Sequence, residues 1–332
     1  MKMEISRRSA LGTIAVAVGG SVAALAIPAP AARAATGDKS KLLLLGTGGG
    51  PILGGERRMS SNVITVGDKA YVIDCGYGAA QAIAEAKVPF KQIASIFITH
   101  NHADHMLDYG SLLFFCWLQG RVAPIDVYGP PPLKKITQSL LDANATPLDY
   151  YKDDLAMNGM PEVIVHELST GGYVMDDGIA KVTCAVVQHP PVRPSFGYRF
   201  DLPDRSIVFS GDTTPSDALI KLAKGADMLV HEAAIFPLVL DMMKAAAAAK
   251  SAPKADGSVP QSFDEERFKA HMYNAHTSAE DAGRVAAAAG VGTLVLNHLT
   301  PGAKMAPDSM WTEQAAKHFK GKIVVAHDGM VL

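Results

Sequence analysis

Short apolar runs closed by glycine, aspartate or histidine recur along the chain from Lys41 onward. Runs of this kind are typical of buried β-strands. They predict strands at residues 42–45, 63–66, 71–73, 93–98, 125–128, 163–167, 180–188, 196–200, 207–210, 228–231, 293–297 and 323–326.

Between many of these runs, apolar residues recur at helical spacing. This pattern predicts helices at residues 78–87, 106–119, 132–145, 216–222, 278–289 and 309–319. Strand and helix segments alternate in both halves of the chain, which favours an α/β fold with two sheets between helical layers. An alanine-rich run at residues 244–250, followed by a polar segment at 251–261, interrupts this alternation.

The first 34 residues are expected to be an export signal peptide rather than part of the fold. Arg7 and Arg8 precede an uncharged stretch that begins at Leu11, and a small-residue cleavage pattern ends at Ala34. The Ser-Arg-Arg sequence resembles a twin-arginine signal. We therefore expect residues 35–332 to form a single domain that is periplasmic or secreted. The export machinery would be a partner during biogenesis, and no membrane association is expected after cleavage; a retained membrane anchor is the alternative.

The charge balance argues against a long nucleic acid as the substrate. Of 332 residues, 31 are lysine or arginine and 33 are aspartate or glutamate. Removing residues 1–34 takes away four basic side chains and one acidic one, which leaves a mildly acidic chain. Such a surface lacks the basic footprint that favours long nucleic acids, so a small substrate is expected.

The three cysteines lie in apolar segments without a C-x-x-C spacing and are predicted to be buried thiols.

Histidines and aspartates gather just after predicted strands, and the densest group follows the strand at residues 93–98. Here His100, His102, Asp104 and His105 occur within six positions. In an extended chain, residues two apart share a face, so His100 and His102 project to the same side. Imidazole and carboxylate groups are ligand types that suit zinc, and packed this closely they would be costly to bury without a cation.

This spacing resembles the H-x-H-x-D-H signature of the metallo-β-lactamase superfamily. The remaining positions of the family pattern are present as His189, Asp212 and His298, each just past a predicted strand. The resemblance implies an αββα sandwich with the metal site at the edge between the two β-sheets, and two Zn²⁺ ions, with Mn²⁺ or Fe²⁺ as substitutes. It assigns His100, His102 and His189 to the first ion, Asp104, His105 and His298 to the second, and Asp212 to a bridge between them.

Further motifs resemble the ribonuclease Z-like branch of this superfamily. His231 opens a His-Glu-Ala sequence, and the resemblance implies that it serves in proton transfer; a purely structural histidine is the alternative. Residues His276, Thr277 and Ser278 are candidate substrate contacts at a helix start, although Ser278 alternatively reads as a simple helix cap. Asp74 resembles the family aspartate that braces the metal-binding loop from outside the set of ligands.

One departure from the branch concerns its tRNA-processing members, which carry a long arm between the third metal histidine and the bridging aspartate. Here His189 and Asp212 are separated by a short, hairpin-sized connection, so no tRNA binding is expected. The extra length lies between His231 and His276, where residues 237–272 could form a lid. A surface insertion unrelated to catalysis is the alternative.

Together, these features predict an exported binuclear metal-dependent hydrolase that acts on a small-molecule anionic ester. A metal-bridging hydroxide is expected to attack the substrate, with His231, Asp104 and Asp212 as catalytic residues.

Small phosphodiesters or aryl sulfate esters are the first candidates, because exported members of the resembled branch include arylsulfatase-like enzymes. Carboxylic esters, lactones and β-lactams are alternatives, as is a non-catalytic metal-binding module. Di-iron redox chemistry is disfavoured because His102 stands where those enzymes carry glutamate. The oligomeric state is open, with a homodimer as one alternative.

Overall fold

In the central strands, side chains are buried on both faces of the sheet. Each sheet must therefore be covered by another layer on each of its faces. In β1 (Lys41–Gly46), Leu42 and Leu44 belong to one apolar cluster, whereas Leu43 and Leu45 belong to another. Successive side chains in a strand point to opposite faces, so the sheet is covered twice. The computed structural model describes residues 39–53, 55–155, 157–250, 263–302 and 305–332, which belong to one compact unit.

The first sheet contains seven strands in the order β14-β1-β2-β3-β4-β5-β6. The strands from β3 to β6 run parallel to one another, and β14, β1, β2 and β3 pair antiparallel. Besides β1, the strand bounds are β2 (Ser61–Val66), β3 (Lys69–Cys75), β4 (Ile93–Phe97), β5 (Ile125–Gly129), β6 (Val163–Glu167) and β14 (Met330–Val331).

The second sheet also contains seven strands, in the order β13-β12-β11-β10-β9-β8-β7. The strands from β10 to β13 are parallel, and β7, β8, β9 and β10 pair antiparallel. The bounds are β7 (Gly172–Asp176), β8 (Lys181–His189), β9 (Val192–Asp201), β10 (Ser206–Phe209), β11 (Met228–Ala234), β12 (Thr293–Thr300) and β13 (Lys322–Val325).

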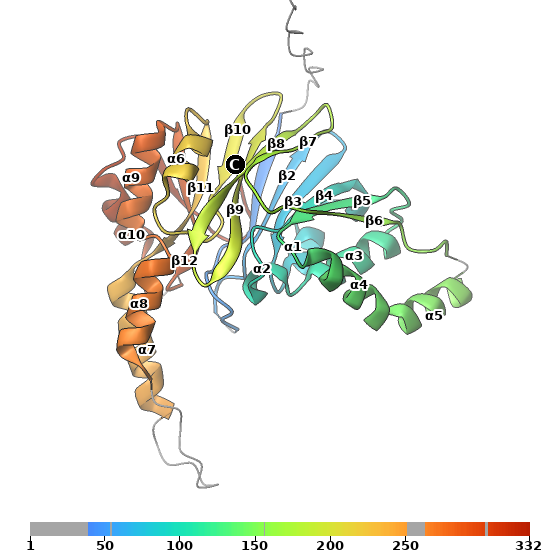
Figure 1. Ribbon diagram of the computed structural model, residues 1–332, viewed down its shortest axis with the longest axis horizontal. Helices are drawn as coiled ribbons and strands as arrows, with labels where there is room; N and C mark the ends of the chain where they lie inside the picture. The colour runs from blue at the N-terminus through green and yellow to red at the C-terminus, as the bar shows by residue number, and fades with distance from the viewer. Residues whose placement is uncertain (1–38, 54, 156, 251–262, 303–304) are drawn as a thin grey trace, which may run out of the picture. The chain divides into compact units, whose positions relative to one another are not determined.

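Helices cover the outer faces, and the two sheets face each other across a shared core (Figure 1). Aromatic residues dominate that core, for example Phe97, Tyr198 and Phe200. The first sheet packs against α1 (Ala79–Glu85), α3 (Tyr109–Leu118) and α4 (Leu133–Ala143). The second packs against α6 (Asp217–Ala223), α9 (Ala279–Ala289) and α10 (Asp308–Ala316). The predicted αββα architecture is therefore confirmed.

The remaining helices are α2 (Ala103–Met106), the 3₁₀ helix η1 (Phe90–Gln92), α5 (Ala145–Leu155), α7 (Phe236–Lys250) and α8 (Glu265–Ala275). Helices α7 and α8 pack together through a small cluster of Phe236, Val239 and Met272 and project away from the sheets (Figure 1). They occupy most of the predicted lid, whose residues 251–262 lie outside the described part of the chain, as does the predicted signal at 1–34. Within the described residues, no helix has both the length and the apolar character needed to cross a membrane.

The predicted strands match observed ones in location, with shifts at their ends, whereas short or polar elements were missed. Strands β7 and β14 and helices α5 and α8 did not appear in the prediction. Strand β7 contains three consecutive apolar residues between exposed ends and β14 contains two residues, so both give only a weak signal for a buried strand. The helix predicted at 78–87 is shorter in the structure, where α1 covers Ala79–Glu85. The helix predicted at 106–119 begins later, because α2 ends at Met106 and α3 begins at Tyr109.

Candidate metal centre

The first group of candidate ligands lies on segments that leave buried strands at one edge of the two sheets. His100 follows β4 and is fully buried. His102 has an extended backbone and precedes the first turn of α2. His189 is the last residue of β8, and Asp212 follows β10. The strand ends therefore bring together residues that are remote in sequence.

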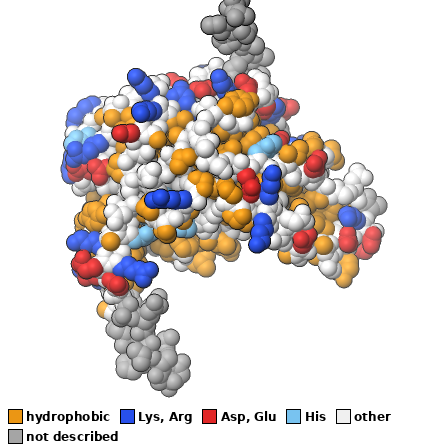
Figure 2. Space-filling model, in the orientation of Figure 1, with side chains coloured by type: hydrophobic (Ala, Val, Ile, Leu, Met, Phe, Trp, Pro, Cys, Tyr) orange, Lys and Arg blue, Asp and Glu red, His pale blue; other side chains and the backbone are white. Residues whose placement is uncertain are grey.

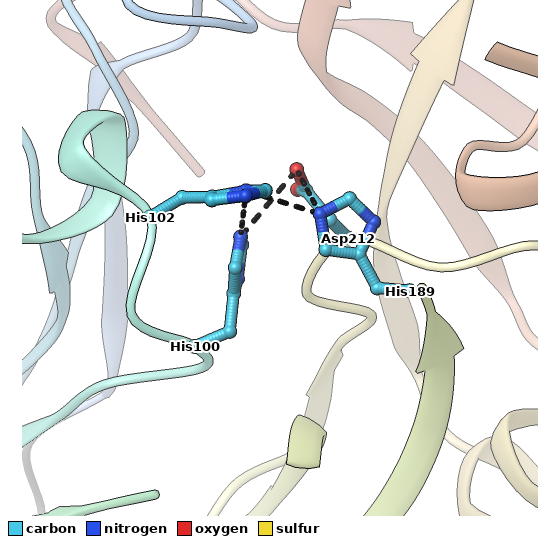
Figure 3. A group of neighbouring side chains, drawn as sticks. All are labelled: His100, His102, His189 and Asp212. Atoms are coloured by element: carbon cyan, nitrogen blue, oxygen red, sulfur yellow. Dashed lines mark hydrogen bonds and ion pairs between the residues drawn. The ribbon is translucent and has the colours of Figure 1, made fainter. Parts of the chain in front are cut away.

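These four side chains point toward one another (Figure 3). Nδ1 of His102 lies 3.0 Å from Nε2 of His100 and 3.1 Å from Nε2 of His189. Oδ2 of Asp212 lies 3.8 Å from Nε2 of His100 and 3.9 Å from Nε2 of His189. Three imidazole nitrogens and one carboxylate oxygen thus surround a single point.

A second group adjoins the first and uses the other oxygen of the same aspartate. Asp104 and His105 lie in the first turn of α2, and His298 lies in β12. Nε2 of His298 is 3.2 Å from Nε2 of His105 and 3.2 Å from Oδ2 of Asp104. Oδ1 of Asp212 is 3.4 Å from the Nε2 atoms of both His105 and His298. Asp212 therefore offers one oxygen to each group.

The distances within each group fit a tetrahedrally bound divalent cation. With bonds of about 2.1 Å, the ligand atoms of a tetrahedral zinc site lie about 3.4 Å apart. In addition, Oδ1 of Asp212 is buried and has no hydrogen-bond donor in the described residues. An unsatisfied buried carboxylate oxygen is costly, and a cation at this position would compensate it. The residues present therefore fit a metal at both groups.

The electrostatic surroundings favour the metal-binding protonation states at the first group only. Burial lowers the pKa of His100 well below its ordinary value and lowers that of His189 to about 4, so both rings are neutral near pH 7. Burial opposes ionisation of Asp212, but His298 and His105 outweigh it and hold its pKa well below the usual range. Neutral imidazoles and ionised carboxylates are the metal-binding forms. At the second group burial opposes the charge on the rings, but Asp212 outweighs burial and raises the pKa of His298 to about 9 and that of His105 well above its ordinary value, so a cation there would displace those protons.

Neighbouring groups fix the orientation of the candidate ligands. Asp74, at the end of β3, accepts hydrogen bonds from the backbone N–H of Thr99 at 2.8 Å and from Nδ1 of His105 at 2.8 Å. The structure thus places Asp74 where a brace for the metal-binding loop was predicted. His189 donates from Nδ1 to the backbone carbonyl of Ala275, the last residue of α8, at 2.7 Å. Such partners leave the opposite ring nitrogen free for a metal.

A β-bulge directs His298 into the site. In the pairing of β11 with β12, Glu232 pairs with Asn297 and Ala233 pairs with Leu299, so His298 is the extra residue. Its φ is +45°, a conformation that non-glycine residues rarely adopt. Bulges commonly redirect one side chain near a functional site, and strain of this kind is retained where the surrounding structure enforces it.

Glu232 and His276 form a hydrogen-bonded pair at the edge of the first group. Nδ1 of His276 lies 2.8 Å from Oε2 of Glu232 and 4.0 Å from Oδ2 of Asp212. Burial and the charge of Asp212 raise the pKa of Glu232 well above its ordinary value, and burial lowers the pKa of His276. Sequence reasoning did not select Glu232, although an acidic residue within an otherwise apolar strand was a usable signal.

His231 does not face the candidate ligands, which corrects its prediction as a catalytic residue. In β11, Leu229 and Ala233 belong to the outer apolar layer with α6, α9 and α10, whereas Val230 belongs to the core between the sheets. His231 shares the outer face because side chains alternate along the strand. It is fully buried, and its Nδ1 donates to the carbonyl of Glu232 at 2.8 Å.

Thr277 and Ser278, the other predicted substrate contacts, make hydrogen bonds within the protein. Thr277 is fully buried and donates from Oγ1 to the carbonyl of Thr213. Ser278 is the N-cap of α9, where its Oγ accepts the backbone N–H of Asp281 at 3.0 Å. Of the three candidates for substrate contact, His276 alone presents its side chain to the candidate metal centre.

The αββα fold and the paired His/Asp groups define a metal-dependent hydrolase of the metallo-β-lactamase fold. The sequence profile described as "Beta-lactamase superfamily domain" matches residues 69–299. The chain belongs to this superfamily. Its relatives there include ribonuclease Z of Mycobacterium bovis (strain BCG / Pasteur 1173P2), which is 31% identical over 294 residues and covers 87% of this chain and 96% of the relative. Ribonuclease Z of Mycobacterium marinum is 30% identical over 292 residues, with the same coverage.

Solved structures with the same fold are more distant in sequence. The short form of human tRNase Z superposes with a TM-score of 0.62 at 22% identity, covering 88% of this chain and 98% of that one. The metallo-β-lactamase fold protein YhfI from Bacillus subtilis gives a TM-score of 0.60 at 21% identity, with coverage of 88% and 98%. At this identity the likeness establishes the fold.

Proposed function

We propose that this protein is an exported hydrolase that binds two zinc ions and cleaves small anionic esters, with phosphodiesters or aryl sulfate esters as substrates. The observation that carries the proposal is the sharing of Asp212 between two groups of His and Asp donors. When bound, the two ions would lower the pKa of a coordinated water and polarise the ester oxygen. The three-histidine group with Asp212 would hold one ion, and Asp104, His105, His298 and Asp212 would hold the other.

The pair of Glu232 and His276 is positioned to deliver a proton to the leaving group. The side chain of His276 is 14% exposed, so a substrate can reach it. Its Nδ1 is engaged with Glu232, and its Nε2 has no hydrogen-bond partner within the described part of the chain. The raised pKa of Glu232 favours a proton on Oε2 that is shared with Nδ1. Nε2–H then donates to the departing oxygen while Nδ1 takes the proton from Glu232, which leaves the imidazole neutral.

The ribonuclease Z relatives support an ester of phosphoric acid as the substrate class. The surroundings of the site favour a small ester over a long nucleic acid. Between His189 and Asp212 the chain forms two tight connections, with His189 paired to Val192 and Asp201 paired to Ser206, and all of these residues are described. Acidic and basic side chains are interspersed over the face of the molecule drawn in Figure 2, and that face shows no continuous basic surface of the kind that long polyanions favour.

A substrate panel with metal analysis tests this proposal. Purified protein without residues 1–34 would be assayed with bis-p-nitrophenyl phosphate, p-nitrophenyl sulfate, p-nitrophenyl acetate and nitrocefin. We expect turnover of one or both of the first two, with close to two equivalents of zinc per chain. Asp212→Asn, which is nearly isosteric, should lose most of the activity and zinc. Turnover restricted to the acetate or nitrocefin would contradict the substrate class.

Export is a separate part of the proposal and rests on residues 1–34. The matched test replaces Arg7 and Arg8 with lysine, which keeps the charge but removes the twin-arginine pair. We expect the unchanged chain in the periplasm or medium, cleaved near Ala34, and the variant retained inside the cell. Equal distribution of both proteins would contradict export by this route.

A further inference from the structure

A cavity of about 220 Å³ lies beside a glycine-rich loop that touches the candidate metal centre. Gly48, Gly49 and Gly50 line the cavity on one side. The backbone N–H of Gly50 donates to Oδ2 of Asp104 at 3.0 Å. One wall of the cavity is therefore separated from a candidate metal ligand by a single hydrogen bond.

The loop is held against β12, which fixes this wall in place. A Cβ atom at Gly49 would lie 2.1 Å from Oγ1 of Thr300 and 2.8 Å from Nδ1 of His298, so a larger residue cannot occupy that position. Leu299, which follows His298, also lines the cavity. Two neighbouring residues of β12 thus serve different purposes, because His298 belongs to the candidate metal centre and Leu299 borders the adjoining space.

The rest of the lining is predominantly apolar. Four apolar side chains line the cavity: Ile52 from the glycine-rich loop, Met59 from the segment before β2, Met242 from α7 and Met305 from the segment before α10. Ile52 and Met305 are 48% and 45% exposed, so the rim is accessible from solvent. Methionine side chains are flexible and polarizable, and they adapt readily to aromatic surfaces. The charged residues Glu56 and Arg57 and the glycines Gly55 and Gly302 complete the lining.

We propose that this cavity binds an apolar, ring-sized group of the substrate, so that the natural substrate is an anionic ester carrying an aryl or comparable hydrophobic substituent. This inference rests on the proposed function and narrows its substrate class. An apolar cavity of about 150 Å³ is enough to bind benzene, so a cavity of 220 Å³ accommodates one aromatic ring. The cavity adjoins the candidate metal centre, because Gly50 contacts Asp104 at 3.0 Å and Leu299 follows His298. A ring on the bound ester would therefore lie beside the reacting group.

The test compares phenylphosphonate with methylphosphonate, which carry the same anionic group and differ in the ring. Binding to the zinc-loaded protein is measured by calorimetry, and the methionine methyl groups are followed by ¹³C NMR. We expect phenylphosphonate to bind at least about tenfold more tightly, as a buried ring should allow. The methyl resonances of Met59, Met242 and Met305 should shift with phenylphosphonate alone. Equal affinity of the two ligands, failure of both to bind, or unchanged resonances of these three methionines would overturn the proposal.

A filled cavity provides the matched variant. Gly302 lines the cavity, is exposed, and has no atom within 4 Å of the position that its Cβ would take. Gly302→Phe should remove the preference for phenylphosphonate and leave the affinity for methylphosphonate unchanged. Gly159→Phe, at another position with open space, is the control and should behave as the unmodified protein. A preference that survives in Gly302→Phe would contradict the assignment of the ring to this cavity.

A second variant covers the case in which Gly302→Phe folds poorly. Met242→Ala enlarges the cavity and should shift the preference from phenylphosphonate toward 2-naphthylphosphonate; an unchanged order would contradict the proposal. Both measurements are binding measurements that need no turnover. A ring preference without hydrolysis of any ester would therefore sustain the cavity and reject the proposed function, and hydrolysis without a ring preference would do the reverse.

Discussion

At the scale of single residues, the contrast between His231 and its neighbours in β11 gives the clearest kinetic prediction. His276→Ala and Glu232→Gln should each lower kcat by about 10²–10⁴-fold, the usual range for a lost general acid. His231→Leu should keep kcat within a few-fold, because this side chain packs in the outer apolar layer. The measurement is steady-state turnover of the best ester in the panel, with zinc content determined for each variant. A loss in His231→Leu as large as in His276→Ala would contradict the assignment.

The three cysteines give a second prediction at this scale. Cys75, Cys116 and Cys184 are buried and unpaired, and burial raises the pKa of Cys116 to about 12 and that of Cys184 to about 11. Thiolates react and thiols do not, so these groups should be inert at pH 8 in the folded protein. Ellman's reagent should report almost no fast reaction before guanidinium is added and close to three thiols per chain afterwards. One rapidly reacting thiol in the native protein would show that a cysteine is more accessible than the fold allows.

The role of a residue could be predicted from the sequence where its position in a motif determines that role. The seven predicted ligands lie in the two groups that the structure brings together. The error at His231 arose because the motif names both His231 and Glu232 without saying which faces inward. The phase of β11 decides this, because successive side chains of a strand point to opposite faces of the sheet.

At the scale of elements, the N-cap of α8 links the projecting helices to the candidate metal centre. Oδ1 of Asp264 accepts the backbone N–H of Arg267 at 2.9 Å. Asp264→Ala should destabilise the start of α8 by about 1 kcal/mol. Because Ala275 at the other end of α8 holds His189, the zinc affinity should fall by up to about tenfold, measured by chelator competition.

The control for that variant is Ser216→Ala. Ser216 caps α6 through Leu219, and α6 carries none of the partners of His189. It should lower stability to a similar degree without changing zinc affinity. Equal zinc affinities in both variants would show that α8 does not position the ligand.

A second element-scale prediction concerns the contact between α9 and α10. Glu280 accepts hydrogen bonds from Lys317, His318 and Arg284, which lower its pKa to about 2. A depressed folded-state pKa contributes stability that is present above the ordinary value of 4.5 and is lost as the pH falls toward 2. The difference in urea midpoint between the unmodified protein and Glu280→Gln should therefore shrink between pH 5 and pH 2.5. A difference independent of pH would contradict this role for Glu280.

At the scale of the whole molecule, metal removal should loosen both sheets at once. The candidate ligands come from the ends of β4, β8 and β10 and from β12, so bound ions would connect the two halves of the sandwich. Chelation should lower the thermal midpoint by several degrees and abolish activity, and added zinc should restore both, since a ligand of the folded state stabilises it by mass action. Scanning calorimetry with and without chelator is the measurement. An unchanged midpoint after verified loss of zinc would contradict a structural coupling of this kind.

The sequence by itself determined the class of fold, the location of the principal strands and the residues that carry metal chemistry. Apolar runs of strand length located the strands, and four of the donors are spaced within one loop. The resemblance to a family motif supplied the particular sandwich and the remaining ligands His189, Asp212 and His298. The tertiary structure decided which face each residue of β11 presents, how the bulge at His298 turns that side chain inward, and where the cavity beside Gly50 lies. These features arise from contacts between segments far apart in the chain, and a local pattern does not encode the register and close approach on which such contacts depend.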